Sequence, residues 1–244
     1  MCRLFAFIAR RPISPSFAFF TGDTNLSSLS QEHKDGWGVA WTSNTGWELH
    51  KEPIPLYTSE NARKLIPEIR TMLLIAHIRK ASQGEVSYKN THPFLYDTWA
   101  FAHNGTINSY ESLLELLGEK ASRLAGNTDS EAFFHLLLSN IEALGDTVEG
   151  VKKTISQLEG IGYTSLNSVF SDGSQLYALN LFKSQDTEYY TMYMGWFMIG
   201  GVELVAVASE PLGDIEGWVP IGNGKLLVID RKLTPTVYPL PPHR

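Results

Sequence analysis

The chain has 244 residues, which we interpret as one large domain rather than two, because a domain takes about 150 residues on average. Hydrophobic residues make up 43% and charged residues 19%, which excludes a disordered, collagen-like or coiled-coil chain. The formal net charge of −6 argues against nucleic acid and anionic membranes as partners. We therefore expect a single domain over residues 1–244, with a Pro-rich tail from about 232 to 244.

No segment has the length or order expected of a membrane anchor or an export signal. Tyr189–Val202, the longest uncharged stretch, has 14 residues, whereas a spanning helix needs roughly 20 apolar ones. The apolar run after Met1 is short, and Arg10 and Arg11 follow it instead of preceding it. A single cysteine permits neither an intrachain disulfide nor a multi-cysteine zinc site. We expect a cytoplasmic protein.

The predicted elements run strands, then helices, then strands. A two-residue alternation predicts the first strands, which are Cys2–Ala9, Gly36–Thr42, Met72–Lys80 and Thr98–Asn104. Helical spacing follows in Asn108–Leu117, Thr128–Leu144 and Asp146–Leu158. The alternation returns in Leu166–Ser171, Gln175–Phe182, Tyr189–Trp196, Glu203–Ser209 and Lys225–Asp230, and the tail is expected to hold no regular element. This order, without βαβ alternation, predicts a layered α+β fold.

Cys2 is the first candidate for chemistry. If Met1 is removed, the chain begins with a cysteine whose own α-amine lies a few bonds from the thiol. Free α-amines titrate near 7.7 to 8.0, so this amine can take the thiol proton, directly or through a water. On composition alone, a small buried apolar residue at the start of an edge strand is the more common explanation of a lone cysteine.

Asn104 and Gly105 end a predicted strand, directly after His103. A side-chain amide followed by a glycine N–H can form an oxyanion hole, because two neutral donors converge on one oxygen. Asn-Gly is also among the commonest turn dipeptides, so a tight turn is the favoured explanation when the pair is considered alone.

Two charged residues suit a zwitterionic ligand. Arg79 ends a predicted strand, where its guanidinium can bind a carboxylate, although a structural ion pair or an exposed arginine are open alternatives. Asp129 follows Thr128, which with Glu131 forms a predicted capping box. Asp129 then either favours the helix dipole or receives a substrate ammonium.

A metal site is the rival explanation for this part of the chain. His77, His92 and His103 could supply ligands, but no pair of them has the i, i+4 helical spacing of a hydrolytic zinc motif. We expect no metal and no other cofactor.

The order of these motifs resembles that of the class II glutamine amidotransferases, which are N-terminal-nucleophile hydrolases, and above all their stand-alone members of the YafJ type. The resemblance rests on Met1-Cys2, His33-Lys34-Asp35-Gly36-Trp37-Gly38, Ala76-His77-Ile78-Arg79-Lys80-Ala81-Ser82, Asn90-Thr91-His92-Pro93-Phe94, His103-Asn104-Gly105 and Thr128-Asp129-Ser130-Glu131. It extends through Leu166–Gly173 and Ala208–Leu212, so it covers nearly the whole chain. The implied fold is a four-layer αββα sandwich.

The resemblance also implies a reaction and the residues that perform it. The Cys2 thiolate attacks the γ-amide of glutamine, ammonia leaves, and a γ-glutamyl thioester is hydrolysed to glutamate. By position, the matching residues are Cys2 as nucleophile and base, Asn104 and Gly105 as oxyanion hole, Arg79 for the α-carboxylate, Asp129 for the α-amine, and Ser82 and His92 as pocket lining. Lys80 departs from the aromatic residue that members with a synthase partner often carry.

Several functions remain open at this point. The ammonia can pass to a separate synthase subunit, or the chain can hydrolyse another γ-glutamyl amide or peptide. A catalytically idle subunit that senses glutamine through Arg79 and Asp129 is the alternative from another class, and a metal-dependent hydrolase comes last. Asn167, which begins a later strand, either helps to hold the N-terminal amine or is a buried amide bonded to backbone.

Overall fold

Two antiparallel β-sheets form the centre of the molecule. The computed structural model describes residues 2–213 and 215–240. The first sheet has the order β11-β9-β10-β1-β4-β2-β3, and the second β13-β12-β8-β7-β6-β5. The first comprises β1 (Arg3–Ile13), β2 (Trp37–Ser43), β3 (Gly46–Glu52), β4 (Thr71–Ile78), β9 (Tyr193–Ile199), β10 (Val202–Ala208) and β11 (Val219–Pro220). The second comprises β5 (Phe94–Tyr96), β6 (Trp99–Asn104), β7 (Asn167–Ser171), β8 (Leu176–Asn180), β12 (Lys225–Ile229) and β13 (Pro235–Pro239).

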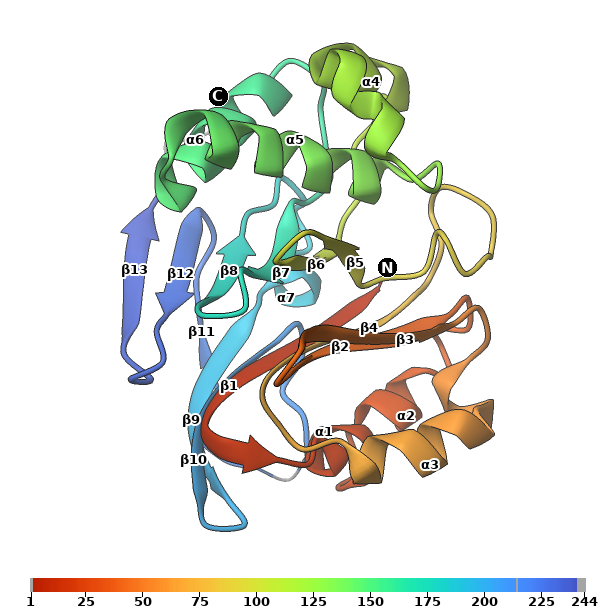
Figure 1. The fold of residues 1–244 in the computed structure, drawn as a ribbon, viewed down its shortest axis with the longest axis vertical. Coiled ribbons are helices and arrows are strands. Elements are labelled where there is room, and N and C mark those ends of the chain that lie inside the picture. Colours follow the sequence, from red (N-terminus) through yellow and green to blue (C-terminus); the bar gives the residue numbers. More distant parts are fainter. Residues whose placement is uncertain (1, 214, 241–244) are drawn as a thin grey trace.

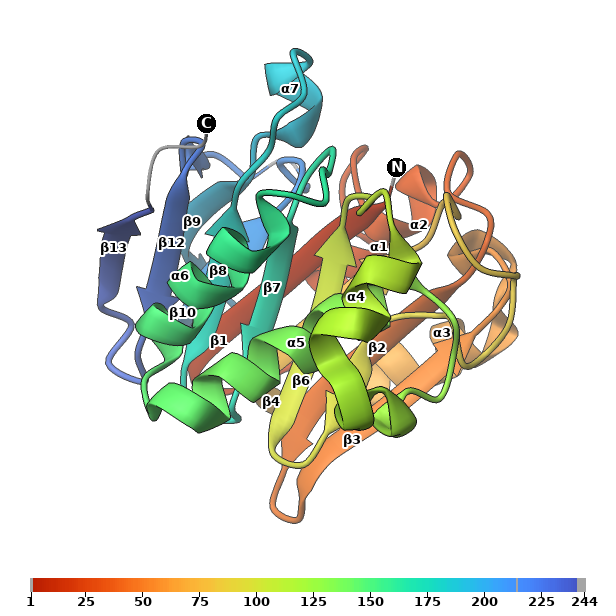
Figure 2. The ribbon, with the colours of Figure 1, turned by 90° about the horizontal axis from the view of Figure 1, so that it is seen from above.

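Helices cover the outer faces of both sheets (Figure 1). On the first sheet lie α1 (Ser16–Phe20), α2 (Leu26–Leu29) and α3 (Glu60–Glu68), with the short 3₁₀ helix η1 (Leu56–Thr58). Over the second lie α4 (Tyr110–Leu117), the 3₁₀ helix η2 (Gly118–Arg123), α5 (Asp129–Leu144) and α6 (Thr147–Leu158), as Figure 2 shows from above. The predicted α+β fold and its four αββα layers are thus confirmed. The remaining helix, α7 (Thr187–Tyr190), stands at the same end as the N-terminus.

The core follows this layering, because each strand sends alternate side chains to opposite faces. Leu4, Ala6 and Ile8 of β1 belong to a cluster between the sheets, whereas Phe5 and Phe7 pack toward the helices α1 to α3. In β2, Trp37, Val39 and Trp41 all join that helix-side cluster. The first sheet is therefore buried on both sides.

Two predictions at the C-terminal end were wrong. Within Tyr189–Trp196, helix α7 ends at Tyr190 and β9 begins only at Tyr193. The tail, expected to be irregular, contains β13, which pairs with β12 along Lys225↔Pro239 to Ile229↔Pro235. Its prolines are tolerated because β13 is an edge strand, where one row of N–H groups needs no partner. Residues 241–244 lie outside the described residues.

Candidate active site

Cys2 lies immediately before β1, the central strand of the first sheet. The edge-strand explanation of this cysteine is therefore wrong. Its Sγ accepts a hydrogen bond from the Lys80 N–H at 3.3 Å and lies 3.5 Å from the Lys80 carbonyl oxygen. Burial raises the pKa of the Cys2 thiol, while the Lys80 N–H and the charge of Arg79 act in the opposite direction. The thiol is thus protonated at neutral pH and needs a base.

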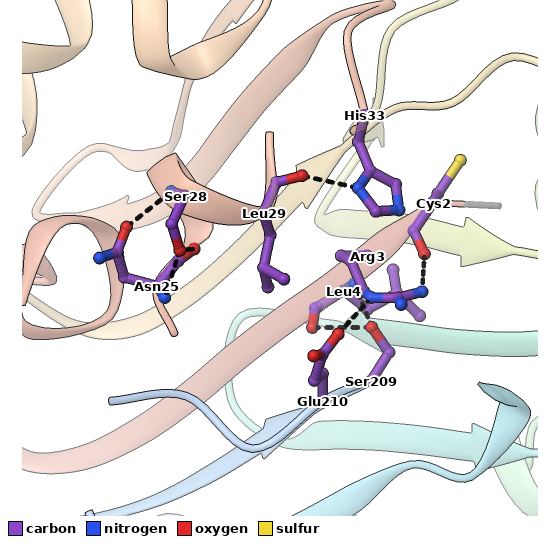
Figure 3. A network of polar contacts seen from close by, with 9 residues as sticks. All are labelled: Cys2, Arg3, Leu4, Asn25, Ser28, Leu29, His33, Ser209 and Glu210. Carbon is purple, nitrogen blue, oxygen red and sulfur yellow. Dashed lines mark hydrogen bonds and ion pairs between the residues drawn. The ribbon is translucent and has the colours of Figure 1, made fainter. Parts of the chain in front are cut away.

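The neighbouring residue, Arg3, anchors the start of β1 on the other side (Figure 3). Its Nε forms an ion pair with Glu210 at 2.7 Å, and its guanidinium lies 4.5 Å from the centre of the Tyr189 ring. In Figure 3 the Cys2 thiol points away from this pair. The Leu4 N–H donates to the Ser209 hydroxyl at 2.8 Å, which further holds this strand end in place.

Side chains from both sheets meet at the Cys2 end because of strand alternation. Cys2 has the same parity as Leu4, and His77 the same parity as Leu73 and Ile75 of β4. On the second sheet, Asn104 has the parity of Ala100 and Ala102. All three residues therefore face the space between the sheets, and they lie at one end of it.

Arg79 is 2% exposed, so neither alternative given for it holds within the described residues: it is not an exposed arginine, and it has no ion-pair partner there. Its guanidinium donates to the carbonyl oxygens of Glu85 at 2.9 Å, Gln83 at 2.8 Å and Gly84 at 3.3 Å. Neutral carbonyls leave the positive charge uncompensated, which is suitable for binding a carboxylate.

Asp129 is 3% exposed, and its Oδ2 accepts the Ile107 N–H at 2.7 Å. The predicted capping box is half correct. Thr128 accepts the Glu131 N–H at 3.2 Å, but the Glu131 carboxylate accepts the N–H groups of Ala125 and Gly126 instead of closing the box. Two acids therefore sit in the first turn of α5, and only Glu131 is used to hold the preceding loop.

A small cavity of about 20 Å³ brings these residues together, and it has room for about one water molecule. It is lined by Cys2, Arg79, Lys80, Ala81, Ser82, Gln83, His92, His103, Gly105, Thr128, Asp129 and Ser130. Six of the seven residues expected at the site from the sequence thus border one space. The seventh, Asn104, is not a lining residue, but it directly precedes Gly105, which is one.

Asn104 is fully buried, and neither atom of its side-chain amide has a hydrogen-bond partner within the described residues. A buried amide without partners is costly by about 1–3 kcal/mol, and the Asn104 amide is therefore available to a ligand that binds beside Gly105. The next position, 105, requires a glycine, because a Cβ there would lie 1.9 Å from the Ser165 carbonyl oxygen.

Three buried histidines surround this region. His103 turns to the opposite face of β6, where it contacts the Ser130 hydroxyl at 2.9 Å and the Ser165 carbonyl at 3.0 Å. The rings of His77 and His92 lie 4.2 Å apart. Burial lowers the pKa of all three, and those of His77 and His92 fall well below the usual value.

Other residues of the site had no role assigned from the sequence. Asp35 accepts the Ala81 N–H at 2.8 Å and so holds the loop after Arg79, and Gln83 donates to the Ile107 carbonyl at 3.0 Å. The Ser82 hydroxyl accepts from Thr106 at 2.9 Å. Asp35 belongs to a motif that carried the resemblance, which was the only signal for it.

Asn167 is a buried amide bonded to backbone, which is the second of the two explanations given for it. Its amide donates to the Tyr190 carbonyl at 2.5 Å and accepts the Leu181 N–H at 2.7 Å. It therefore ties α7 to the second sheet. Met1, whose removal would free the amine of Cys2, lies outside the described residues.

Within residues 2–213 and 215–240, no three histidine, cysteine, aspartate or glutamate side chains are grouped so that they could hold a metal ion. In the same described part, no helix combines the length and the apolar character needed to cross a membrane.

The family model of the class II glutamine amidotransferases matches residues 1–191, so this chain belongs to that family. It is 32% identical to an uncharacterized protein of Methanocaldococcus jannaschii, over 93% of this chain and 69% of that protein. It is 37% identical to YafJ of Escherichia coli, over 58% of this chain and 55% of YafJ. The glutamine–fructose-6-phosphate aminotransferase of Chlamydia muridarum is 29% identical over 66% of this chain but only 26% of that enzyme.

Solved structures give the same fold. A glutamine aminotransferase class-II domain protein from Silicibacter pomeroyi superposes with a TM-score of 0.73, at 25% identity, over 99% of this chain and all of that one. An allosteric regulatory enzyme of purine biosynthesis superposes with a TM-score of 0.75 at 17% identity, over 98% of this chain and 49% of that one. Because this chain spans about half of YafJ and a quarter of the aminotransferase, the activity of those whole proteins does not transfer directly.

Proposed function

We propose that this chain is a glutamine amidohydrolase in which Cys2, freed by removal of Met1, is the nucleophile. The observation that carries the proposal is the convergence of a thiol, an arginine and an aspartate on one cavity, beside a buried unpartnered amide. A zwitterionic amino acid needs one fixed cation and one fixed anion, and Arg79 and Asp129 supply them. The names of several relatives, such as the glutamine–fructose-6-phosphate aminotransferases, also include glutamine.

Substrate binding follows from the charges. The α-carboxylate of glutamine binds the guanidinium of Arg79 and replaces the loop carbonyls that this guanidinium now binds. The α-ammonium binds Asp129. This fixes the γ-amide beside Cys2, with its oxygen toward the Asn104 amide and the Gly105 N–H. Since the cavity holds only about one water, the loop around Ser82 and Gln83 moves when glutamine enters.

The chemistry has two steps. The Cys2 α-amine takes the thiol proton, and Sγ attacks the carbonyl carbon of the γ-amide while Asn104 and Gly105 stabilise the oxyanion. The C–N bond breaks and ammonia leaves with the proton from the amine. A water then attacks the thioester carbon, the C–S bond breaks, and glutamate leaves with Cys2 restored.

The alternative candidate is another γ-glutamyl amide or peptide, whose leaving group is larger than ammonia. Comparing glutamine with γ-glutamyl peptides as substrates separates the two candidates by their kcat/KM values.

The fate of the ammonia defines the partner. Some relatives are named as aminotransferases, and we propose that a separate subunit accepts the ammonia and uses it. A thiol nucleophile must stay reduced, which supports a cytoplasmic location.

The test is intact mass measurement before and after treatment with 6-diazo-5-oxo-norleucine, an electrophilic analogue of glutamine. We expect loss of Met1 and one adduct, which Cys2→Ala abolishes together with ammonia release. A matched control inserts one alanine before Cys2, so that processing still occurs but the amine belongs to another residue. We expect this protein to fold and to lose about 10²- to 10⁴-fold in turnover, the usual contribution of a general base.

Full turnover by the extended protein would exclude the amine of Cys2 as the base. Glutamine binding without ammonia release from processed protein would instead support an idle sensing subunit. Activity that disappears on chelation would support a metal-dependent hydrolase.

A further inference from the structure

His92 is a buried polar side chain without a structural task of its own. It is 3% exposed, and neither ring nitrogen has a hydrogen-bond partner within the described residues. Unpartnered buried nitrogens destabilise the folded state, and proteins satisfy such groups with ordered water or a ligand. The ring nitrogens of His92 therefore indicate that a water molecule or another small polar ligand binds to them.

The position of this ring is firmly held. On one side it packs on His77 with ring centres 4.2 Å apart, and on the other on Phe94 at 4.5 Å. Gly38 of β2 makes room for the backbone, because a Cβ there would lie 2.2 Å from the His92 carbonyl oxygen. His77, in turn, projects from β4 next to the backbone of His103. The stack fixes where the nitrogens of His92 point.

Both imidazoles are neutral at physiological pH. Desolvation is the largest cause of their lowered pKa values, and the charge of Arg79 adds to it. A neutral imidazole has one N–H donor and one acceptor nitrogen. A water molecule can therefore give a hydrogen bond to His92, or accept one from it, without gaining a proton.

The site of this small polar ligand at His92 borders the reacting atoms. His92, Cys2 and Gly105 line the same cavity, whose volume suits about one water molecule. Gly105 belongs to the proposed oxyanion hole, so the carbonyl carbon of a thioester on Cys2 would lie at the edge of this space, which the proposed movement of the loop around Ser82 and Gln83 enlarges. A water bound to His92 would therefore lie beside that carbon.

We propose that His92, backed by His77, holds the water that hydrolyses the γ-glutamyl thioester. This inference rests on the proposed function and assigns the second step of it. The water oxygen forms a bond to the thioester carbon, its proton passes to the α-amine of Cys2, and the C–S bond breaks. The sulfur then recovers the proton from the amine, and glutamate leaves. His92 touches the reacting water, whereas His77 is a positioning residue.

The test separates formation of the thioester from its hydrolysis. In His92→Phe, which keeps the ring stack but removes both nitrogens, we expect a burst of ammonia followed by turnover about 10²-fold slower, with the γ-glutamyl adduct accumulating on Cys2 in intact mass spectra. Hydroxylamine, a strong nucleophile that needs no held water, should still release the acyl group as the hydroxamate. His92→Gln, which restores a donor and an acceptor, should recover part of the hydrolysis.

His77→Phe serves as a second variant if His92→Phe does not fold, and it should show the same split with a smaller loss. Phe94→Leu tests the packing alone, because it loosens the contact with His92 without removing a polar atom, and it should change the ratio of the two steps less than His92→Phe does. Parallel loss of ammonia burst and hydrolysis, or no adduct in either histidine variant, would overturn the proposal. If the unaltered, processed protein releases no ammonia, the proposed function fails and this assignment falls with it.

Discussion

The two ends of the β-sandwich differ in how their polar groups are used. At the Cys2 end, the amide of Asn104 and the ring of His92 are buried without partners around a cavity of about 20 Å³. At the opposite end, where β1 finishes near Pro12, the cavity is about 790 Å³. There Trp47 donates to the Thr98 carbonyl at 2.7 Å and Arg231 to the Gly173 carbonyl at 2.6 Å.

Cavity size is therefore a poor guide to chemistry in this molecule. Pockets are usually ranked by volume and shape. Here the small space is lined by Cys2, Arg79 and Asp129, and the unpartnered amide of Asn104 directly precedes its lining residue Gly105. The larger space also has charged lining residues, among them Arg70, Asp97, Asp172 and Arg231, but it has no cysteine.

Among the variants that test the contrast between the two ends, we expect the largest loss of activity at Asn104. We expect Asn104→Ala to lower kcat by about 10²- to 10³-fold, the usual loss for one oxyanion donor, with KM for glutamine little changed. The measurement is steady-state release of ammonia.

Asn180 supplies the matched control for this variant. Its amide is also fully buried and unpartnered within the described residues, but it lies two strands away on β8. Asn180→Ala should leave kcat unaltered. An equal loss in both variants would mean that removal of a buried amide lowers kcat through the fold and not through the oxyanion.

The next effect concerns substrate affinity. We expect Asp129→Asn to raise KM for glutamine by about 10- to 150-fold, because a charged hydrogen bond contributes about 1.5–3 kcal/mol. The asparagine oxygen can still accept the Ile107 N–H, so the fold should survive.

Glu131→Gln is the control for Asp129. This second buried acid of α5 binds the Ala125 and Gly126 N–H groups, so its loss should change stability and leave KM within about twofold. A comparable rise of KM in both variants would show that Asp129 acts through the loop and not through the substrate.

A thermodynamic prediction follows from the neutral histidines. His77, His92 and His103 resist protonation in the folded state, while the unfolded chain binds those protons below its pKa of about 6.5. The free energy of unfolding should therefore fall as the pH drops below about 6.5, by up to about 1.4 kcal/mol per pH unit for each histidine. Urea unfolding at several pH values measures this, and His92→Gln should reduce the slope. A slope that His92→Gln leaves unaltered would contradict the prediction.

The smallest effect is expected at the opposite end. Arg231→Ala, in the large cavity, should change glutamine turnover by no more than about twofold, because it touches neither the substrate nor the loop of Arg79. A marked loss of turnover would show that the two ends are coupled, and the contrast between them would then fail.

Most of the fold could be predicted because it depends on local pattern. The alternation in β1, β2 and β4 and the helical spacing of α5 and α6 are set by neighbouring residues, which the sequence displays directly. Most elements that were missed are short or lie at edges, although the 9-residue helix α3 was missed as well. The 5-residue α1, the 4-residue α2 and the edge strand β13 owe their stability to packing on a sheet, which no local pattern reveals.

For the site, the sequence by itself determined which side chains are available: a cysteine after Met1, an Asn-Gly pair at a strand end, and an arginine and an aspartate of opposite charge. Only the tertiary structure decided that they share one space, because Cys2 and Arg79 lie at the ends of neighbouring strands β1 and β4 of the first sheet, whereas Asp129 comes from helix α5 over the second sheet. The same holds for the unpartnered state of Asn104 and His92. A hydrogen bond that is not made can be recognised only when every neighbour is in place.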